Sequence, residues 1–134
     1  MKDVKRFTIA MACLASFLGM PASAASWVYV TTGTSNTSHY YEVETIHRSG
    51  TQVTFWEKRD HSRDKTLKER ENRVRLRVNC TETTYAILNG IRYFPNGKIE
   101  TVDIPAYLQE ENVVAPETTG EAMLKAVCAA TAPE

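Results

Sequence analysis

The sequence predicts one α+β domain, an antiparallel sheet with a single C-terminal helix packed on it. From residue 26 to about residue 102, short stretches rich in Val, Thr, Tyr and Ile alternate with turn residues, which is typical of antiparallel strands. Residues 118–130 instead carry apolar side chains at helical spacing. After removal of an N-terminal export signal two cysteines remain, Cys80 and Cys128. An even count in an oxidising compartment predicts one disulfide between them, which would stabilise the fold by about 2 to 4 kcal/mol.

Residues 1–24 have the pattern of a signal peptide. A basic start precedes an apolar run, and Ala22 and Ala24 place small residues where a signal peptidase recognises them. We expect cleavage after Ala24, leaving a single domain over residues 25–134 in the periplasm or on the cell surface. The apolar run is shorter than the roughly 20 residues that cross a bilayer, and no later segment is long enough, so we expect no transmembrane segment.

Cys13 leaves one alternative for this leader, attachment of a lipid. Residues 10–12, Ala-Met-Ala, lack the leucine usual before a lipidated cysteine, and a better cleavage site lies downstream. We therefore expect a released domain.

The predicted strands follow one another closely along the chain. Ser49–Gly50, Asn89–Gly90 and Pro95–Gly97 are tight-turn signals, and we expect each to join two neighbouring strands in a hairpin. The expected strands are residues 27–32, 39–46, 52–58, 73–80, 83–88, 91–94 and 98–102.

Two segments lack strand character. Residues 60–72 are dense in charge with Leu67 as their one apolar residue, so we expect a solvated loop or frayed strand ends that stay out of the core. Residues 103–119 contain prolines and acids without periodicity, which indicates a connection that crosses the sheet edge.

The last element has helix signals at its start and along one face. Thr118 or Thr119 can cap it, and Glu121 in the first turn suits the positive end of the helix dipole. The helix should lie on the sheet, with Leu124 beside its apolar stripe and Cys128 along the same surface. The stripe consists of Ala122, Met123, Ala126, Val127 and Ala130.

Charge and motifs exclude several classes of protein. Without the leader, 13 basic and 15 acidic side chains remain of the 16 of each in the whole chain, a net charge of −2 that argues against a nucleic-acid binder. No nucleophile elbow or phosphate-binding glycine loop is present, so we expect a non-enzymatic protein without a cofactor. His39, His47 and His61 lack the spacing of a metal motif.

Several motifs stand in a set order along the chain: Trp27, Tyr40–Tyr41, Arg48-x-Gly50, Val53-x-Phe55-Trp56, Asn79–Cys80, Tyr85, and the close from Pro116 to Cys128 with Gly120–Glu121 and Leu124–Lys125. Taken together, these motifs resemble the protein E surface-adhesin domain family of Gram-negative bacteria. The resemblance implies a sheet of about six antiparallel strands with one C-terminal helix joined to it by the disulfide. It also implies binding of host matrix proteins, as by the lipid-anchored founding adhesin.

A row of arginines is the first candidate ligand surface. Arg73, Arg75 and Arg77 alternate with apolar residues, so they share one strand face, and residues 57–77 carry nine basic against five acidic side chains. With Lys65 and Lys68 nearby, this field could bind an acidic protein or an anionic polysaccharide. The alternative is that the arginines pair across strands with Glu42, Glu44 or Glu57.

Aromatic residues form the second candidate surface. Adjacent pairs such as Tyr40–Tyr41 and Phe55–Trp56 send one ring to each side of the sheet, and we expect Tyr41 and Trp56 among the contact residues. An unpaired sheet edge would also permit a homodimer.

A rival function belongs to another class, a periplasmic inhibitor of a hydrolase such as lysozyme. Lysozymes of that kind are basic, and the acidic residues 103–117 could form the inhibitory loop.

Overall fold

The computed structural model describes Gly19 and residues 25–132. The predicted cleavage site and the rest of the leader lie outside the described residues. The elements, in chain order, are β1 (Trp27–Thr32), β2 (Ser38–Glu42), β3 (His47–Ser49), β4 (Gln52–Asp60), β5 (Glu71–Asn79), β6 (Thr84–Tyr93), β7 (Ile99–Asp103), the 3₁₀ helix η1 (Ala106–Leu108), β8 (Asn112–Val113) and α1 (Thr119–Ala130).

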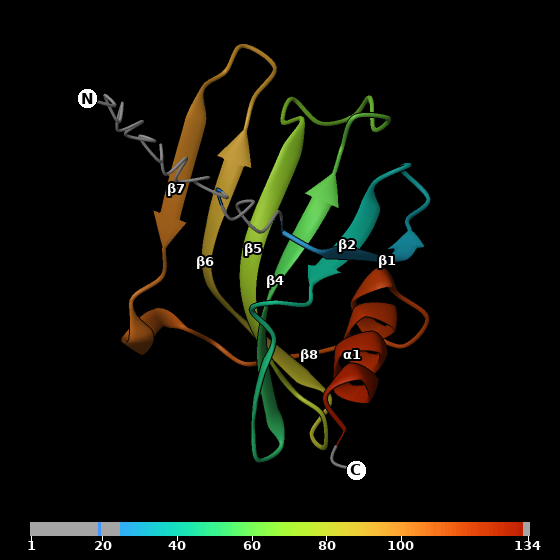
Figure 1. The fold of residues 1–134 in the computed structure, drawn as a ribbon, viewed down its shortest axis with the longest axis vertical. Helices are drawn as coiled ribbons and strands as arrows, with labels where there is room; N and C mark the ends of the chain where they lie inside the picture. Colours follow the sequence, from blue (N-terminus) through green and yellow to red (C-terminus); the bar gives the residue numbers. More distant parts are fainter. Residues whose placement is uncertain (1–18, 20–24, 133–134) are drawn as a thin grey trace, which may run out of the picture.

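The strands form one antiparallel sheet in the order β1-β2-β4-β5-β6-β7 (Figure 1). Two short strands lie off this path: β3 pairs with β4, and β8 pairs with β6. Helix α1 packs against β1, β2 and β4. The 3₁₀ helix η1 lies near the opposite edge of the sheet, below β7 in Figure 1. The predicted fold class is therefore confirmed, with six strands in the main path.

The core lies between the sheet and α1. Because side chains alternate along a strand, every second residue of β4 and β5 points toward the helix. Val53 and Phe55 from β4 meet Val127 of α1, and all three are at most 1 % exposed. The rest of the buried cluster is Val74, Leu76, Val78, Val114, Met123 and Leu124.

Helix α1 begins where the sequence predicts. The Thr118 hydroxyl accepts a hydrogen bond from the Glu121 N–H at 3.3 Å, so Thr118 is the N-cap. At the other end, the Arg48 guanidinium donates to the carbonyl oxygens of Cys128 and Thr131, both at 3.4 Å. The buried stripe is rotated from the expected one, since Leu124 belongs to it and Ala130 is exposed.

The disulfide joins β5's end to the helix as predicted. Cys80 and Cys128 are bonded with Cα atoms 5.9 Å apart, and the link closes a separation of 48 residues. It holds α1 on the sheet from the helix's C-terminal turns.

The Asn89–Gly90 hairpin prediction is wrong. Both residues lie inside the continuous strand β6, where Asn89 pairs with Arg75 and Gly90 with Val74. A tight hairpin there would need positive φ angles, which neither residue adopts. Strand β5 is long enough to pair with the whole of β6, so no turn forms at Asn89–Gly90. The register shifts at Leu88, which forms a β-bulge.

The strand predicted for residues 39–46 is interrupted after Glu42. The Thr45 hydroxyl donates to the Glu42 carboxylate at 2.9 Å and closes a short turn, after which β3 begins. Both β2 and β3 pair with β4, and Gly50, with φ of 60°, makes the predicted turn from β3 to β4.

The connecting segment runs along the edge of β6, as the sequence indicates. It leaves β7 where the Ile104 N–H donates to the Leu88 carbonyl, and it returns where the Val114 N–H donates to the Thr83 carbonyl, both at 3.0 Å. Between these points lie η1 and β8, and the segment leads directly into α1 (Figure 1).

Candidate functional site

The sheet has two faces of different character. One is covered in part by α1, and we call the other the open face. Its members lie at the strand positions that alternate with the core residues. They include Trp27, Tyr29, Tyr40, Trp56, Lys58, Arg73, Arg75, Arg77, Ile91 and Tyr93, together with the acidic residues Glu42 and Glu71.

Cations and aromatic rings are interleaved on the open face. The Lys58 ammonium lies 4.3 Å from the Tyr40 ring centre and 5.0 Å from that of Trp27. The Arg73 guanidinium lies 5.6 Å from Trp27 and 5.0 Å from Tyr93. Each such contact contributes roughly 0.5 to 1 kcal/mol at an exposed site, so this patch is held in a defined arrangement.

The arginine row divides into a paired and an unpaired part. Arg73 Nε lies 2.6 Å from the Glu71 carboxylate on its own strand. Arg75 and Arg77 make no ion pair within the part of the chain that the structure describes, and Arg75 is exposed beside Trp56. The alternative pairings with Glu42, Glu44 or Glu57 do not occur among the described residues, and Glu57 points to the helix side.

The other predicted contact residues separate in space. Trp56 lies on the open face beside Trp27 and Arg73. Lys65 and Lys68 are exposed in the loop between β4 and β5. Tyr41 is on the opposite face and packs against the core, so Tyr40 is the ring of that pair on the open face.

On the helix side, a cavity of about 420 Å³ separates α1 from the middle of the sheet. Its apolar wall comes from three directions, with Phe55 at the base, Ile87 and Val113 at the rim, and Met123 on the helix. The polar side chains His39, Glu57 and Arg59 line one end of it.

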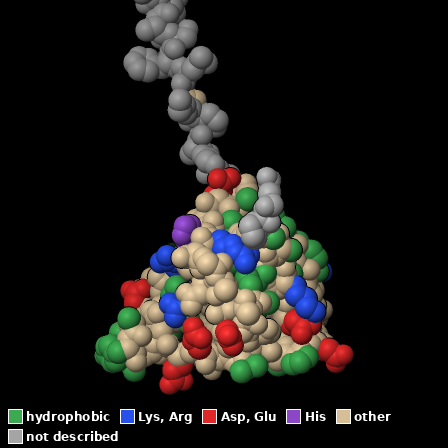
Figure 2. All heavy atoms as spheres, turned by 90° about the horizontal axis from the view of Figure 1, so that it is seen from below, with side chains coloured by type: hydrophobic (Ala, Val, Ile, Leu, Met, Phe, Trp, Pro, Cys, Tyr) green, Lys and Arg blue, Asp and Glu red, His purple; other side chains and the backbone are tan. Residues whose placement is uncertain are grey.

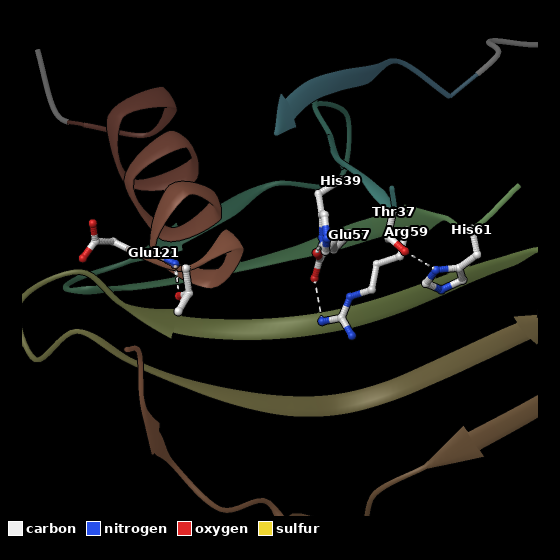
Figure 3. A network of polar contacts seen from close by, with 7 residues as sticks. Thr37, His39, Glu57, Arg59, His61 and Glu121 are labelled. Atoms are coloured by element: carbon white, nitrogen blue, oxygen red, sulfur yellow. Dashed lines mark hydrogen bonds and ion pairs between the residues drawn. The ribbon is translucent and has the colours of Figure 1, made fainter. Parts of the chain in front are cut away.

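Glu57 is the centre of that polar end. It is 3 % exposed, and its two oxygens accept from His39 Nδ1 at 2.6 Å and from Arg59 Nη2 at 2.9 Å. Burial raises the pKa of Glu57, but the hydrogen bond from His39 and the charge of Arg59 outweigh it and hold the pKa below its usual value. Figure 3 shows His39 and Arg59 meeting Glu57 beside the first turn of α1.

Sequence reasoning missed this group, although the signal was present. Phe55, Glu57 and Arg59 alternate with outward residues of β4, so the period that places Phe55 in the core also places Glu57 on the same side. Because the residues at and after the end of β4 are rich in charge, the sequence favoured a solvent-exposed position for them, although the alternation along the strand places Glu57 and Arg59 on the core side.

A second buried network lies in the loop after β4. Asp64 and His61 are each 6 % exposed, and the Thr37 hydroxyl donates to Asp64 at 2.8 Å and lies 2.9 Å from His61 Nδ1. Hydrogen bonds from Thr66 and Thr37 hold the pKa of Asp64 far below its ordinary value. The expectation that residues 60–72 stay out of the interior is thus wrong for His61 and Asp64, since these hydrogen bonds compensate for burial.

The three histidines do not gather. His39 bonds Glu57, His61 bonds Thr37, and His47 is exposed on β3. Over residues 25–132, no three His, Cys, Asp or Glu side chains are placed to hold one metal ion. Nor does any helix there have the length and hydropathy needed to cross a membrane.

A comparison with known protein families shows which family this chain belongs to. The profile of the family described as surface-adhesin protein E matches residues 27–129. The chain belongs to this family. The predicted resemblance is confirmed, and a surface-adhesin domain is the general class of the protein.

Solved structures of the family show the same fold. One crystal form of Haemophilus influenzae protein E superposes with a TM-score of 0.58 at 16% identity, over 81% of this chain and 91% of that one. Protein E from non-typeable Haemophilus influenzae gives a TM-score of 0.50 at 16% identity, over 82% and 81%. No curated protein matches the sequence. At this identity the likeness extends to the fold and not to individual surface residues.

Proposed function

We propose that this chain is an exported, non-enzymatic recognition domain that binds an acidic protein or a sulfated polysaccharide through the open face. The observation that supports this most strongly is the pair Arg75 and Arg77, which have no acidic partner among the described residues although their neighbour Arg73 has one. Unpaired guanidinium groups favour recognition of carboxylate or sulfate groups, and Arg75 has the Trp56 ring beside it.

The surroundings extend this field. Lys65 and Lys68 project from the exposed loop between β4 and β5, which follows the open-face residue Lys58 in sequence. Trp56 supplies an apolar contact between the arginines and Trp27. An acidic ligand that covers this area would be attracted over a distance, and the attraction would weaken as salt is raised.

The test is binding of heparin, a sulfated polysaccharide, and of a matrix protein at low and at physiological salt. We expect Arg75→Ser/Arg77→Ser to reduce affinity at least tenfold while leaving the circular-dichroism spectrum unchanged. The matched control is Lys98→Ser/Lys125→Ser, which removes two exposed cations elsewhere and should have little effect. Equal binding by both double variants would remove the open face from consideration.

A homodimer is a further part of this proposal. Among the described residues strand β7 pairs only with β6, which leaves its outer edge without a partner strand there, and Ile99 and Val102 on it are 59 % and 50 % exposed. Light scattering coupled to gel filtration measures the mass, and Val102→Lys should shift a dimer to monomer.

Inhibition of a hydrolase such as lysozyme is a second candidate function, favoured by the connecting segment. Tyr107 and Leu108 of η1 are 85 % and 57 % exposed, and Glu110 and Glu111 follow them. Figure 2 shows hydrophobic side chains projecting at the left edge of the molecule, where Figure 1 places η1. A lysozyme assay tests this function, and inhibition that Tyr107→Ala abolishes would support it over the adhesin function.

The location of the protein follows from the predicted leader. Fractionation of cells distinguishes periplasm from outer surface, and mass spectrometry of the mature N-terminus should find Ala25. An acylated Cys13 would replace the released domain by a membrane-tethered one.

A further inference from the structure

We propose that the cavity between α1 and the sheet binds a small amphiphile with an apolar body and a carboxylate head, of the class of medium-chain fatty acids. This site lies on the opposite side of the sheet from the open face, and it is independent of the function proposed for that face.

The cavity has the size and lining of a small-molecule site. Its volume of about 420 Å³ falls in the range of roughly 300 to 1,000 Å³ that such sites occupy. Phe55 at its base is 1 % exposed, whereas Ile87 and Val113 at its rim are 36 % and 78 % exposed. The apolar wall therefore opens to solvent at one side, through which an alkyl chain could enter.

The polar end of the cavity favours an anion over a cation. Among the described residues that line the cavity, Glu57 is the one acidic residue, and both of its oxygens accept hydrogen bonds, from His39 and Arg59. A cationic head group at this end would lie beside the Arg59 guanidinium, whose like charge repels it. No other lining side chain carries a negative charge.

Arg59 offers the free donors that a carboxylate needs. Its Nη2 bonds Glu57, while its Nε is buried without a hydrogen-bond partner among the described residues. A guanidinium group has five N–H donors in a planar fork, which matches the two oxygens of a carboxylate. In Figure 3 the Arg59 side chain extends along the sheet beside the site, with its head group near Glu57.

The first turn of α1 adds to the same preference. Thr119 and Gly120 line the cavity, and the N-terminus of this 12-residue helix carries a partial positive charge. The Thr118 cap leaves the N–H groups of these two residues without an intrahelical partner. Arg59 and the helix end thus both favour a negatively charged head group.

The experiment is calorimetric titration of the mature protein with decanoate, below the concentration at which it forms micelles. We expect one saturable site, and decylammonium, with the same tail and the opposite charge, should bind at least tenfold more weakly. Failure to saturate, or equal affinity for both amphiphiles, would overturn the proposal.

Two variants locate the site. Ile87→Glu places a carboxylate at the exposed rim and should weaken decanoate binding at least tenfold, whereas the matched control Val43→Glu makes the same change in a distant exposed turn. Arg59→Gln should also weaken binding at least tenfold, by removing a charged hydrogen bond, and Arg70→Gln in the exposed loop is its control.

Because Arg59→Gln also removes a partner of Glu57, its folding is checked by circular dichroism. If it does not fold, Ile87→Glu decides alone, since a rim residue that is 36 % exposed tolerates the change. Decanoate binding that Ile87→Glu leaves intact would place the ligand elsewhere and refute the site. Arg75→Ser/Arg77→Ser reports on the open face separately, so either proposal can fail without the other.

Discussion

His39 Nδ1 lies 2.6 Å from Oε1 of Glu57, although 18 residues separate the two in sequence. The contact exists because β2 and β4 pair so that His39 stands opposite Arg59 and next to Glu57 on the helix side. A carboxylate that is 3 % exposed is thereby held between an imidazole and a guanidinium. Stability and a candidate binding site depend on the same three side chains.

Removing the carboxylate of Glu57 should therefore destabilise the fold strongly. Glu57→Ala leaves His39 without its partner and Arg59 without its ion pair; because Arg59 is one-third exposed and can be hydrated, we expect a loss of about 1.5 to 3 kcal/mol, the cost of a hydrogen bond to a charged group. Urea unfolding followed by circular dichroism measures the change. Glu44→Ala, at an exposed position two residues after β2, is the control and should change stability by less than about 0.5 kcal/mol.

The disulfide, which holds α1 on the sheet, should contribute several kcal/mol to the free energy of unfolding. For a closed loop of this length, restriction of the unfolded chain is worth about 4 kcal/mol, and engineered removals typically give 2 to 5 kcal/mol. Cys80→Ser/Cys128→Ser should show this loss in urea unfolding, and reductant should lower the stability of the parent but not of the variant. Free thiols in the non-reduced parent protein would contradict the structure.

Asp64 should make stability depend on acid pH. Because its folded pKa lies below its usual 3.8, the folded state binds fewer protons than the unfolded chain there. Its contribution is complete at pH 7 and is lost as the pH falls through 3.8 and below. We expect Asp64→Asn to be less stable than the parent at pH 7 and to have a flatter stability profile between about pH 5 and pH 2. A parallel profile, offset by a constant amount, would show that Asp64 does not titrate in this way.

Alanine substitutions at two glycines test whether β6 continues through Gly90 as a strand. Gly90 is extended, and a Cβ there would meet its nearest atom, the Arg73 carbonyl oxygen, at an ordinary 3.5 Å. Gly97 has φ of 85° in the turn before β7. Gly90→Ala should be neutral or stabilising by up to about 1 kcal/mol, and Gly97→Ala should cost roughly 1 to 2 kcal/mol. Thermal unfolding of both variants gives the comparison, and a large loss at Gly90 would favour a turn there.

Local patterns were sufficient for much of the fold. The alternation of Arg73, Arg75 and Arg77 with Val74, Leu76 and Val78 predicts both faces of β5, because the period of two is a property of any strand. The cap at Thr118 likewise depends on neighbours only three residues away. The turn at Asn89–Gly90 failed for the opposite reason, since its partners on β5 are 14 to 16 residues distant and outweigh the local turn preference.

The candidate sites likewise contain features that local patterns predict and features that depend on contacts between distant residues. The class of fold, the cysteine pair and the outward arginine row could be predicted from the amino-acid sequence, because they follow from residue type and short-range period. The meeting of Glu57, His39 and Arg59 beside a cavity, and the place of Tyr40 rather than Tyr41 on the face of the arginines, became visible in the folded chain alone. Those outcomes depend on strand register and on where the helix lies over the sheet, and both are set by packing between residues far apart in the chain.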